Sequence, residues 1–223
     1  MSVAPAPTRR LHPLAVRIMH WTNAVAMIVM IFSGFGIYND EVIFGWLFFP
    51  KWLLLFGDWA AEYLLWHFAA MWVLVVNGLL YLTYGLVTGR FRERLFPISA
   101  AEAVNDVRDA LHLKLTHADL TIYNSVQKLL YLAVILIAIL QVSSGLAIWT
   151  PVQFSGLTAL FGDFQGARLA HFLGMASIVG FLVVHVALAL LVPRTLLAML
   201  NGGPHITPRT RHPASLDAPE RRA

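Results

Sequence analysis

The sequence predicts an all-α integral membrane protein, a four-helix bundle with both termini in the cytoplasm. Composition is the first observation: 58% of the 223 residues are hydrophobic and 13% are charged, with a mean hydropathy of +0.68. A soluble domain of this size would need a more polar surface. The second observation is four mostly apolar segments of about 20 residues or more, the length that a transmembrane helix needs. They are residues 14–38, 63–87, 125–149 and 168–192.

The placement of the basic residues is the third observation, and it predicts the orientation. Lysine and arginine gather before or at the start of the first span, between the second and third, and after the fourth. The two opposite loops and their borders hold only Lys51 and Arg168, beside the acidic residues Asp40, Glu41, Asp58, Glu62 and Asp163. The positive-inside rule therefore places both termini and the central loop in the cytoplasm. This orientation accounts for the net charge of +4, so no nucleic-acid partner is expected.

The chain is expected to form one membrane domain, residues 1–200, followed by a cytoplasmic tail, residues 201–223. The tail is rich in proline and arginine and lacks apolar periodicity, so we expect it to be disordered. The first span contains polar residues and no convincing small-residue cleavage site, which favours a retained helix over a signal peptide. No internal repeat is evident beyond the placement of four histidines.

The loop between the first two spans, residues 39–62, is unusually apolar for a connection. Pro50 and Lys51 divide it into pieces too short to cross a membrane. Its tryptophans, Trp46, Trp52 and Trp59, suit the lipid headgroup region. An interfacial segment is the favoured interpretation, and a docking surface for a partner protein is the alternative.

Cysteine is absent from the chain, which limits the chemistry that it can carry. There is no CxxCH motif for covalent c-type haem, no thiolate for an iron–sulfur cluster and no disulfide. Any redox centre must therefore be held without cysteine. Non-covalent haem b with axial histidine ligands satisfies that restriction.

Two histidines in the fourth span, His171 and His185, are fourteen residues apart. At about 100° per residue they return to nearly the same helix face, and the rise of about 1.5 Å per residue separates them by about 21 Å. Ionisable residues inside a membrane are costly and tend to be functional. Two further intramembrane histidines, His20 and His67, bring the number of candidate ligands to four, enough for two haem groups.

The depth of each histidine in the membrane predicts how the four pair. His20 lies about 9 Å into the first span from the cytoplasmic side, and His185 about 10 Å from the same side. His67 lies about 6 Å into the second span from the outside, and His171 about 5 Å. We therefore pair His20 with His185 and His67 with His171, because each pair shares one depth. Haem b needs two such imidazoles facing each other across the porphyrin.

Alternatives to this di-haem site are a single haem, or histidines that serve a proton relay or a metal site. The third span has no histidine and only Gln141, Ser143 and Ser144 as internal polar groups, so it is expected only to pack. Arg17, one turn before His20, either pairs with a haem propionate or serves as an ordinary cytoplasmic anchor.

The chain resembles the prokaryotic cytochrome b561 family, which includes the cytochrome b subunits of nickel–iron hydrogenase and formate dehydrogenase. The resemblance begins at HPLAVRIMHWTNAVAMIVMIFSGFGIYN and covers nearly the whole chain. Its specific parts are the His-Trp pair of the first span and the His-x13-His spacing of the fourth, in ARLAHFLGMASIVGFLVVHVALALLVPR. The resemblance implies that His20 and His185 bind a cytoplasmic-side haem b, and His67 and His171 a periplasmic-side one.

The same resemblance implies electron transfer across the bacterial inner membrane between quinone and a periplasmic redox enzyme. The chain looks especially like relatives that accompany a molybdopterin oxidoreductase of the sulfite-oxidase type; a hydrogenase or dehydrogenase is the other type of partner. A stand-alone superoxide/quinone oxidoreductase is an alternative, and a non-redox anchor or transporter is a further one. No proline interrupts the spans, which disfavours a transporter. The sequence leaves oligomerisation open.

Overall fold

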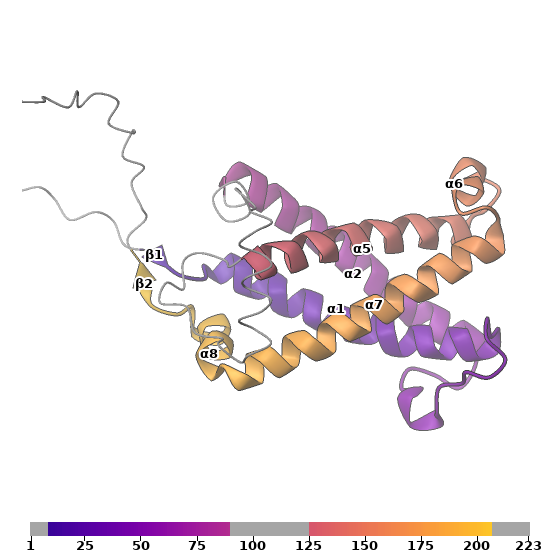
Figure 1. The fold of residues 1–223 in the computed structure, drawn as a ribbon, viewed down its shortest axis with the longest axis horizontal. Coiled ribbons are helices and arrows are strands. Elements are labelled where there is room, and N and C mark those ends of the chain that lie inside the picture. The colour runs from indigo at the N-terminus through magenta and orange to yellow at the C-terminus, as the bar shows by residue number, and fades with distance from the viewer. Residues whose placement is uncertain (1–8, 90–124, 207–223) are drawn as a thin grey trace, which may run out of the picture.

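The structure is a computed structural model that describes residues 9–89 and 125–206, and four long helices dominate it (Figure 1). These are α1 (Leu14–Asp40), α2 (Ala60–Val87), α5 (Ser125–Trp149) and α7 (Phe164–Leu191). Each contains a stretch that is long and apolar enough to cross a membrane. The predicted all-α fold with four spans is therefore confirmed.

The helices differ from the predicted spans mainly at the ends that meet the α1–α2 and α5–α7 connections. Helices α1, α2 and α7 extend beyond the apolar segments by two to four residues there, whereas α5 has the predicted bounds. Helix α8 (Pro193–Asn201) ends one residue beyond the predicted domain boundary at residue 200, and the two-residue strand β2 (His205–Ile206) follows within the predicted tail. Residues 207–223 of the predicted tail lie outside the described residues.

The long helices pack as two hairpins, α1 against α2 and α5 against α7. Within the most apolar stretch of each helix, only 22% of the α1 residues and 6% of the α7 residues are buried inside the molecule. A helix that is apolar on all sides and exposes most of them suits contact with lipid chains.

Within the first hairpin a buried asparagine joins the two helices. The Asn77 amide nitrogen donates to the Met19 carbonyl oxygen and to the Asn23 side-chain oxygen, at 2.7 Å in each case. Further along, Gly36 faces the Tyr63 ring so closely that a Cβ there would overlap the ring. Small residues permit such close approach between membrane helices, and hydrogen bonds add to their association.

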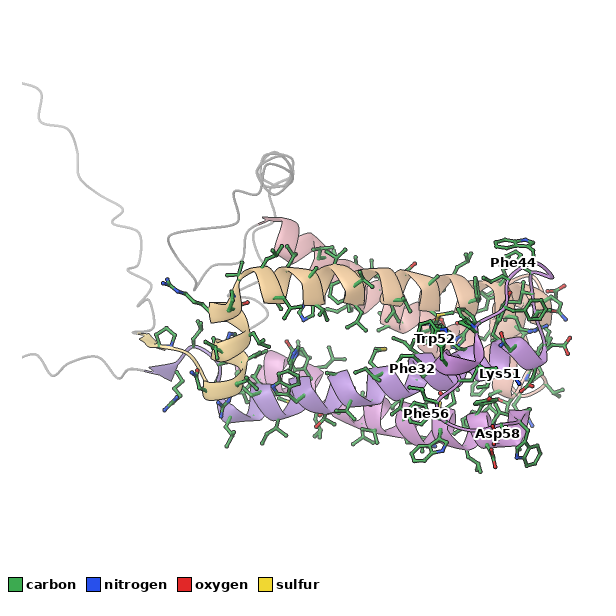
Figure 2. All side chains as sticks on the ribbon, turned by 90° about the horizontal axis from the view of Figure 1, so that it is seen from below. Phe32, Phe44, Lys51, Trp52, Phe56 and Asp58 are labelled. Atoms are coloured by element: carbon green, nitrogen blue, oxygen red, sulfur yellow. The ribbon has the colours of Figure 1, made fainter. Side chains whose placement is uncertain are left out.

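The connection between α1 and α2 folds back onto α1 through Asn39. The Asn39 side chain donates to the Phe49 carbonyl oxygen at 2.8 Å and accepts from the Phe49 amide at 2.9 Å. Phe49 also stacks on Phe35 with a ring-centroid distance of 4.0 Å. The connection contains the 3-10 helix η1 (Lys51–Leu53). Figure 2 shows Lys51, Trp52, Phe56 and Asp58 at the end of the molecule away from α8.

The three tryptophans of this connection are exposed, with 80% of Trp46, 73% of Trp52 and 60% of Trp59 accessible. The short helix α6 (Ser155–Leu160) lies at the same end of the molecule (Figure 1). Arg168 joins the two hairpins here, because its guanidinium donates to the Glu41 carbonyl oxygen. Such exposed tryptophans suit either the headgroup region or a protein partner.

At the opposite end, α8 turns back toward the start of α1. Strand β1 (Arg9–Arg10) pairs antiparallel with β2, and the Leu11 and His12 amides donate to Pro204 and Gly202 at 3.0 Å. Three side chains bind the last carbonyl groups of α8, which lack partners within the helix. Arg10 donates to Asn201, Arg17 to Leu200 at 2.6 Å, and Trp21 to Met199 at 3.4 Å. We call these contacts and the β1–β2 pair the terminal latch.

Candidate functional site: two histidine pairs

The structure brings the four intramembrane histidines together as two pairs, each of which joins one hairpin to the other. His67 on α2 faces His171 on α7, with ring centroids 6.3 Å apart and ring planes at 63°. His20 on α1 faces His185 on α7, with centroids 6.1 Å apart and planes at 59°. These are the partners expected from depth. We call them the outer and the inner pair, after the sides of the membrane that the sequence predicts for them.

The spacing of the rings fits two imidazoles on one iron. Two imidazole rings that held one metal ion through bonds of about 2.0–2.1 Å, with about 1.1 Å from each bonded nitrogen to its ring centre, would have centroids up to about 6.3 Å apart. The observed separations of 6.1 and 6.3 Å agree with that value. Within residues 9–89 and 125–206, no three His, Cys, Asp or Glu side chains gather as a metal site. Two histidines suffice for haem, since the porphyrin supplies the other nitrogen ligands.

Each histidine of the outer pair hydrogen-bonds to a serine on the neighbouring helix of its own hairpin. Ser33 Oγ lies 3.0 Å from His67 Nδ1, and Ser144 Oγ lies 3.0 Å from His171 Nδ1. Both serines are fully buried. Helix α5 packs against α7, as predicted, and through Ser144 it also contacts a candidate ligand, a contact that was not predicted.

The serine contacts favour one tautomer of each histidine ring. A hydroxyl has one hydrogen, and Ser33 directs it to the Val29 carbonyl oxygen at 2.7 Å, as Ser144 does to Leu140 at 2.6 Å. Each serine oxygen is then left to accept a hydrogen bond, which favours the tautomer with the proton on Nδ1. In that tautomer the lone pair of the neutral imidazole is on Nε2, the nitrogen that remains for a metal.

Glycines beside these serines let the rings approach the helix backbone. A Cβ at Gly34 would lie 3.6 Å from His67 Cε1, and one at Gly145 would lie 3.3 Å from His171 Cε1. The side chain of Gln141, one turn before Gly145, packs against the α7 backbone at Gly174. With its amide nitrogen turned toward α7, it donates to the His171 carbonyl oxygen at 2.9 Å. The outer pair is thus oriented by α1 and α5.

The inner pair has aromatic rather than hydrogen-bonded neighbours. Trp21 meets the His20 ring edge-on at 5.4 Å, and Phe181 stacks on His185 at 5.6 Å. Among the described residues no hydrogen bond to either ring is seen. Arg17, considered above as a propionate partner, donates instead to the Leu200 carbonyl oxygen in the terminal latch.

The serines were missed because they look like ordinary small residues of a span, but the sequence does carry a signal for them. Ser-Gly-x-x-Ile occurs at residues 33–37 and again at 144–148, and His-Phe-x-x-Met occurs at 67–71 and at 171–175. The two hairpins therefore share a short internal repeat in addition to the placement of the four histidines. In both copies the serine of the first helix contacts the histidine of the second.

A membrane helix bundle with paired histidines between its helices has the architecture of a membrane-bound b-type cytochrome. This chain belongs to the prokaryotic cytochrome b561 family, whose profile matches residues 11–202. It is also 46% identical over 192 residues to a protein of Azospira oryzae named putative protein-methionine-sulfoxide reductase subunit YedZ1. The matched region covers 86% of this chain and 96% of that protein. The chain is thus a multi-pass membrane cytochrome that takes part in electron transfer, and family membership implies haem b.

Proposed function

We propose that the protein is a di-haem electron-transfer subunit of the bacterial inner membrane, which connects the quinone pool to a periplasmic redox enzyme. The observation that carries the proposal is the pair of facing histidines at each of two depths, with centroid separations of 6.1 and 6.3 Å. His20 and His185 would hold the inner haem b. His67 and His171 would hold the outer one.

Each haem, when bound, supplies a one-electron ferric–ferrous couple. The protein contributes ligation, orientation and an apolar environment. Helix α7 provides one ligand to each site, and the fourteen residues between His171 and His185 correspond to about 21 Å along the helix axis. This one helix therefore sets the separation of the two centres and the distance that electrons cross.

The orientation follows from the basic residues. We propose that the terminal latch and α8 face the cytoplasm, since most lysines and arginines belong to that end, and that η1 and α6 face the periplasm. The inner pair then lies nearer the cytoplasm and the outer pair nearer the periplasmic partner.

The relative from Azospira is named as a subunit of a protein-methionine-sulfoxide reductase. On that basis we propose that electrons leave quinol, pass outward through the two pairs and reach a periplasmic reductase of the molybdopterin class. Reduction of a sulfoxide to a thioether consumes two electrons and two protons and releases water. Oxidation of one quinol to quinone supplies the two electrons and releases two protons at the quinone site, and the reductase takes up two protons from its own surroundings.

Haem content and substitution of the ligands test the proposal. The purified protein should show a b-type band in a reduced-minus-oxidised spectrum and two haems per chain. His185→Leu and His67→Leu should each leave one haem, whereas Phe68→Leu, beside His67, should leave two. Absence of a b-type band would overturn the function, and retention of both haems in the histidine variants would overturn the ligand assignment.

A further inference from the structure

We infer that Ser33 and Ser144 are positioning residues that lower the reduction potential of the outer centre, by orienting His67 and His171 and strengthening both as electron donors. The inference rests on the proposed binding of haem by the outer pair. It goes beyond ligation, because neither serine would contact the metal. It assigns α1 and α5 a common role in tuning that centre.

The direction of the effect follows from the hydrogen-bond roles. Each serine hydroxyl donates to a backbone carbonyl, which leaves its oxygen, 3.0 Å from the histidine Nδ1, to accept from the tautomer that carries its proton on Nδ1. Donation from Nδ1–H fixes the ring orientation and raises the basicity of the ligating nitrogen. A more basic ligand stabilises ferric over ferrous iron, so loss of the bond raises the potential.

Because the Ser33–His67 contact is repeated by Ser144 and His171, we infer that neither contact is incidental. The same Ser-Gly step on the first helix of each hairpin meets the same His-Phe step on the second, with equal Oγ–Nδ1 distances. Both serines are completely inaccessible to solvent. Two independent helix pairs thus present one arrangement to the two sides of a single candidate centre.

The inner pair provides a comparison within the same molecule. Its rings meet Trp21 and Phe181, and within the described part of the chain no serine hydrogen-bonds to either one. Substitution of Ser33 or Ser144 should therefore change the outer centre and leave the inner centre as an internal reference.

Ser143 is a matched control, since it is adjacent to Ser144 on the same helix. Its hydroxyl donates to the Ile139 carbonyl oxygen at 2.8 Å, as Ser144 does to Leu140. Its hydrogen bonds are to Ile139 and Leu140. Ser143→Ala therefore removes a comparable back-bonded hydroxyl without removing a ligand contact.

The experiment is an optical redox titration of the haem-loaded full chain, with electron paramagnetic resonance of its ferric form. Ser33→Ala and Ser144→Ala are made in the wild-type chain and in His185→Leu, in which the outer centre is the one that remains. Each should raise the potential of the outer centre, changing its reduction equilibrium constant by up to about tenfold, or 59 mV for one electron. The double variant should shift it further, and the ferric g values of that centre should change.

Ser143→Ala should leave both potentials unchanged. Loss of the outer haem from a serine variant, with the inner haem at its normal potential, would also support the inference, because the inner haem reports an intact fold. Two haems with wild-type potentials and g values in Ser33→Ala and Ser144→Ala would overturn it while leaving the proposed function standing. Absence of haem from the wild-type chain would instead contradict the proposed function.

Discussion

Gly34 and Gly145 show how closely the ligand rings of the outer pair approach the neighbouring helices. They occupy equivalent positions in the two hairpins, yet the space beside them differs. A Cβ at Gly34 would make an ordinary contact of 3.6 Å with His67, whereas a Cβ at Gly145 would lie 3.3 Å from His171. The second distance requires the ring to shift by a few tenths of an ångström.

Gly145→Ala and Gly34→Ala should therefore differ in their effect on outer-haem binding, although both add the same methyl group. We expect Gly145→Ala to displace His171 and weaken outer-haem binding by up to about tenfold, the lower end of the effect of disturbing a ligand's support. Gly34→Ala should retain that haem. Haem titration of the apoprotein in the His185→Leu background measures both. Equal affinity in the two variants would contradict the difference in fit.

At the scale of elements, the terminal latch connects the two helices that carry the inner pair. It joins the start of α1, which bears His20, to α8, which follows directly from α7 and His185. The outer pair has the Ser33 and Ser144 hydrogen bonds instead. The two pairs are thus held by different contacts: the inner pair by contacts between helix termini, and the outer pair by buried serine side chains.

Arg17→Ala should loosen the latch and disturb the inner centre. Loss of the bond to Leu200 should lower the free energy of unfolding by about 1 kcal/mol. The inner-haem g values should change while those of the outer haem persist. Thermal unfolding and electron paramagnetic resonance measure the two effects. Arg194→Ala removes the same charge from an exposed position at the same end, so identical results from both variants would refute the role of the latch.

At the scale of the whole molecule, α8 lies at one end of the four spans, and η1 and α6 lie at the other (Figure 1). Residues 9–10 and 205–206 pair with each other, so both ends of the described domain meet beside α8, away from η1 and α6 (Figure 1). Which side of the membrane each end faces is part of the proposed function.

The absence of cysteine makes this orientation directly measurable. Val152→Cys, at a position 82% exposed near α6, should react with a membrane-impermeant maleimide added to spheroplasts. Arg194→Cys, in α8, should react only after the membrane is opened, because the positive-inside rule places it in the cytoplasm. Labelling of Arg194→Cys alone in sealed spheroplasts would invert the proposed orientation.

The four spans were predictable from the sequence because a membrane imposes a minimum apolar length on each helix. The pairing of His20 with His185 and of His67 with His171 was predictable as a hypothesis, because depth follows from residue count along a helix. Both inferences use the helix axis alone. The structure brings the same histidines together, and their binding of haem stays a prediction.

The contacts of Ser33 and Ser144, the packing as two hairpins and the terminal latch were decided only by the tertiary structure. Each depends on how a helix is rotated about its axis and which neighbour it meets. Nearly uniform apolar spans leave that rotation undefined in the sequence, since every face suits lipid. The sequence by itself thus determined the spans and the depths of the histidines. Helix packing decided which side chains reach those histidines, because buried hydrogen bonds need that lateral fit.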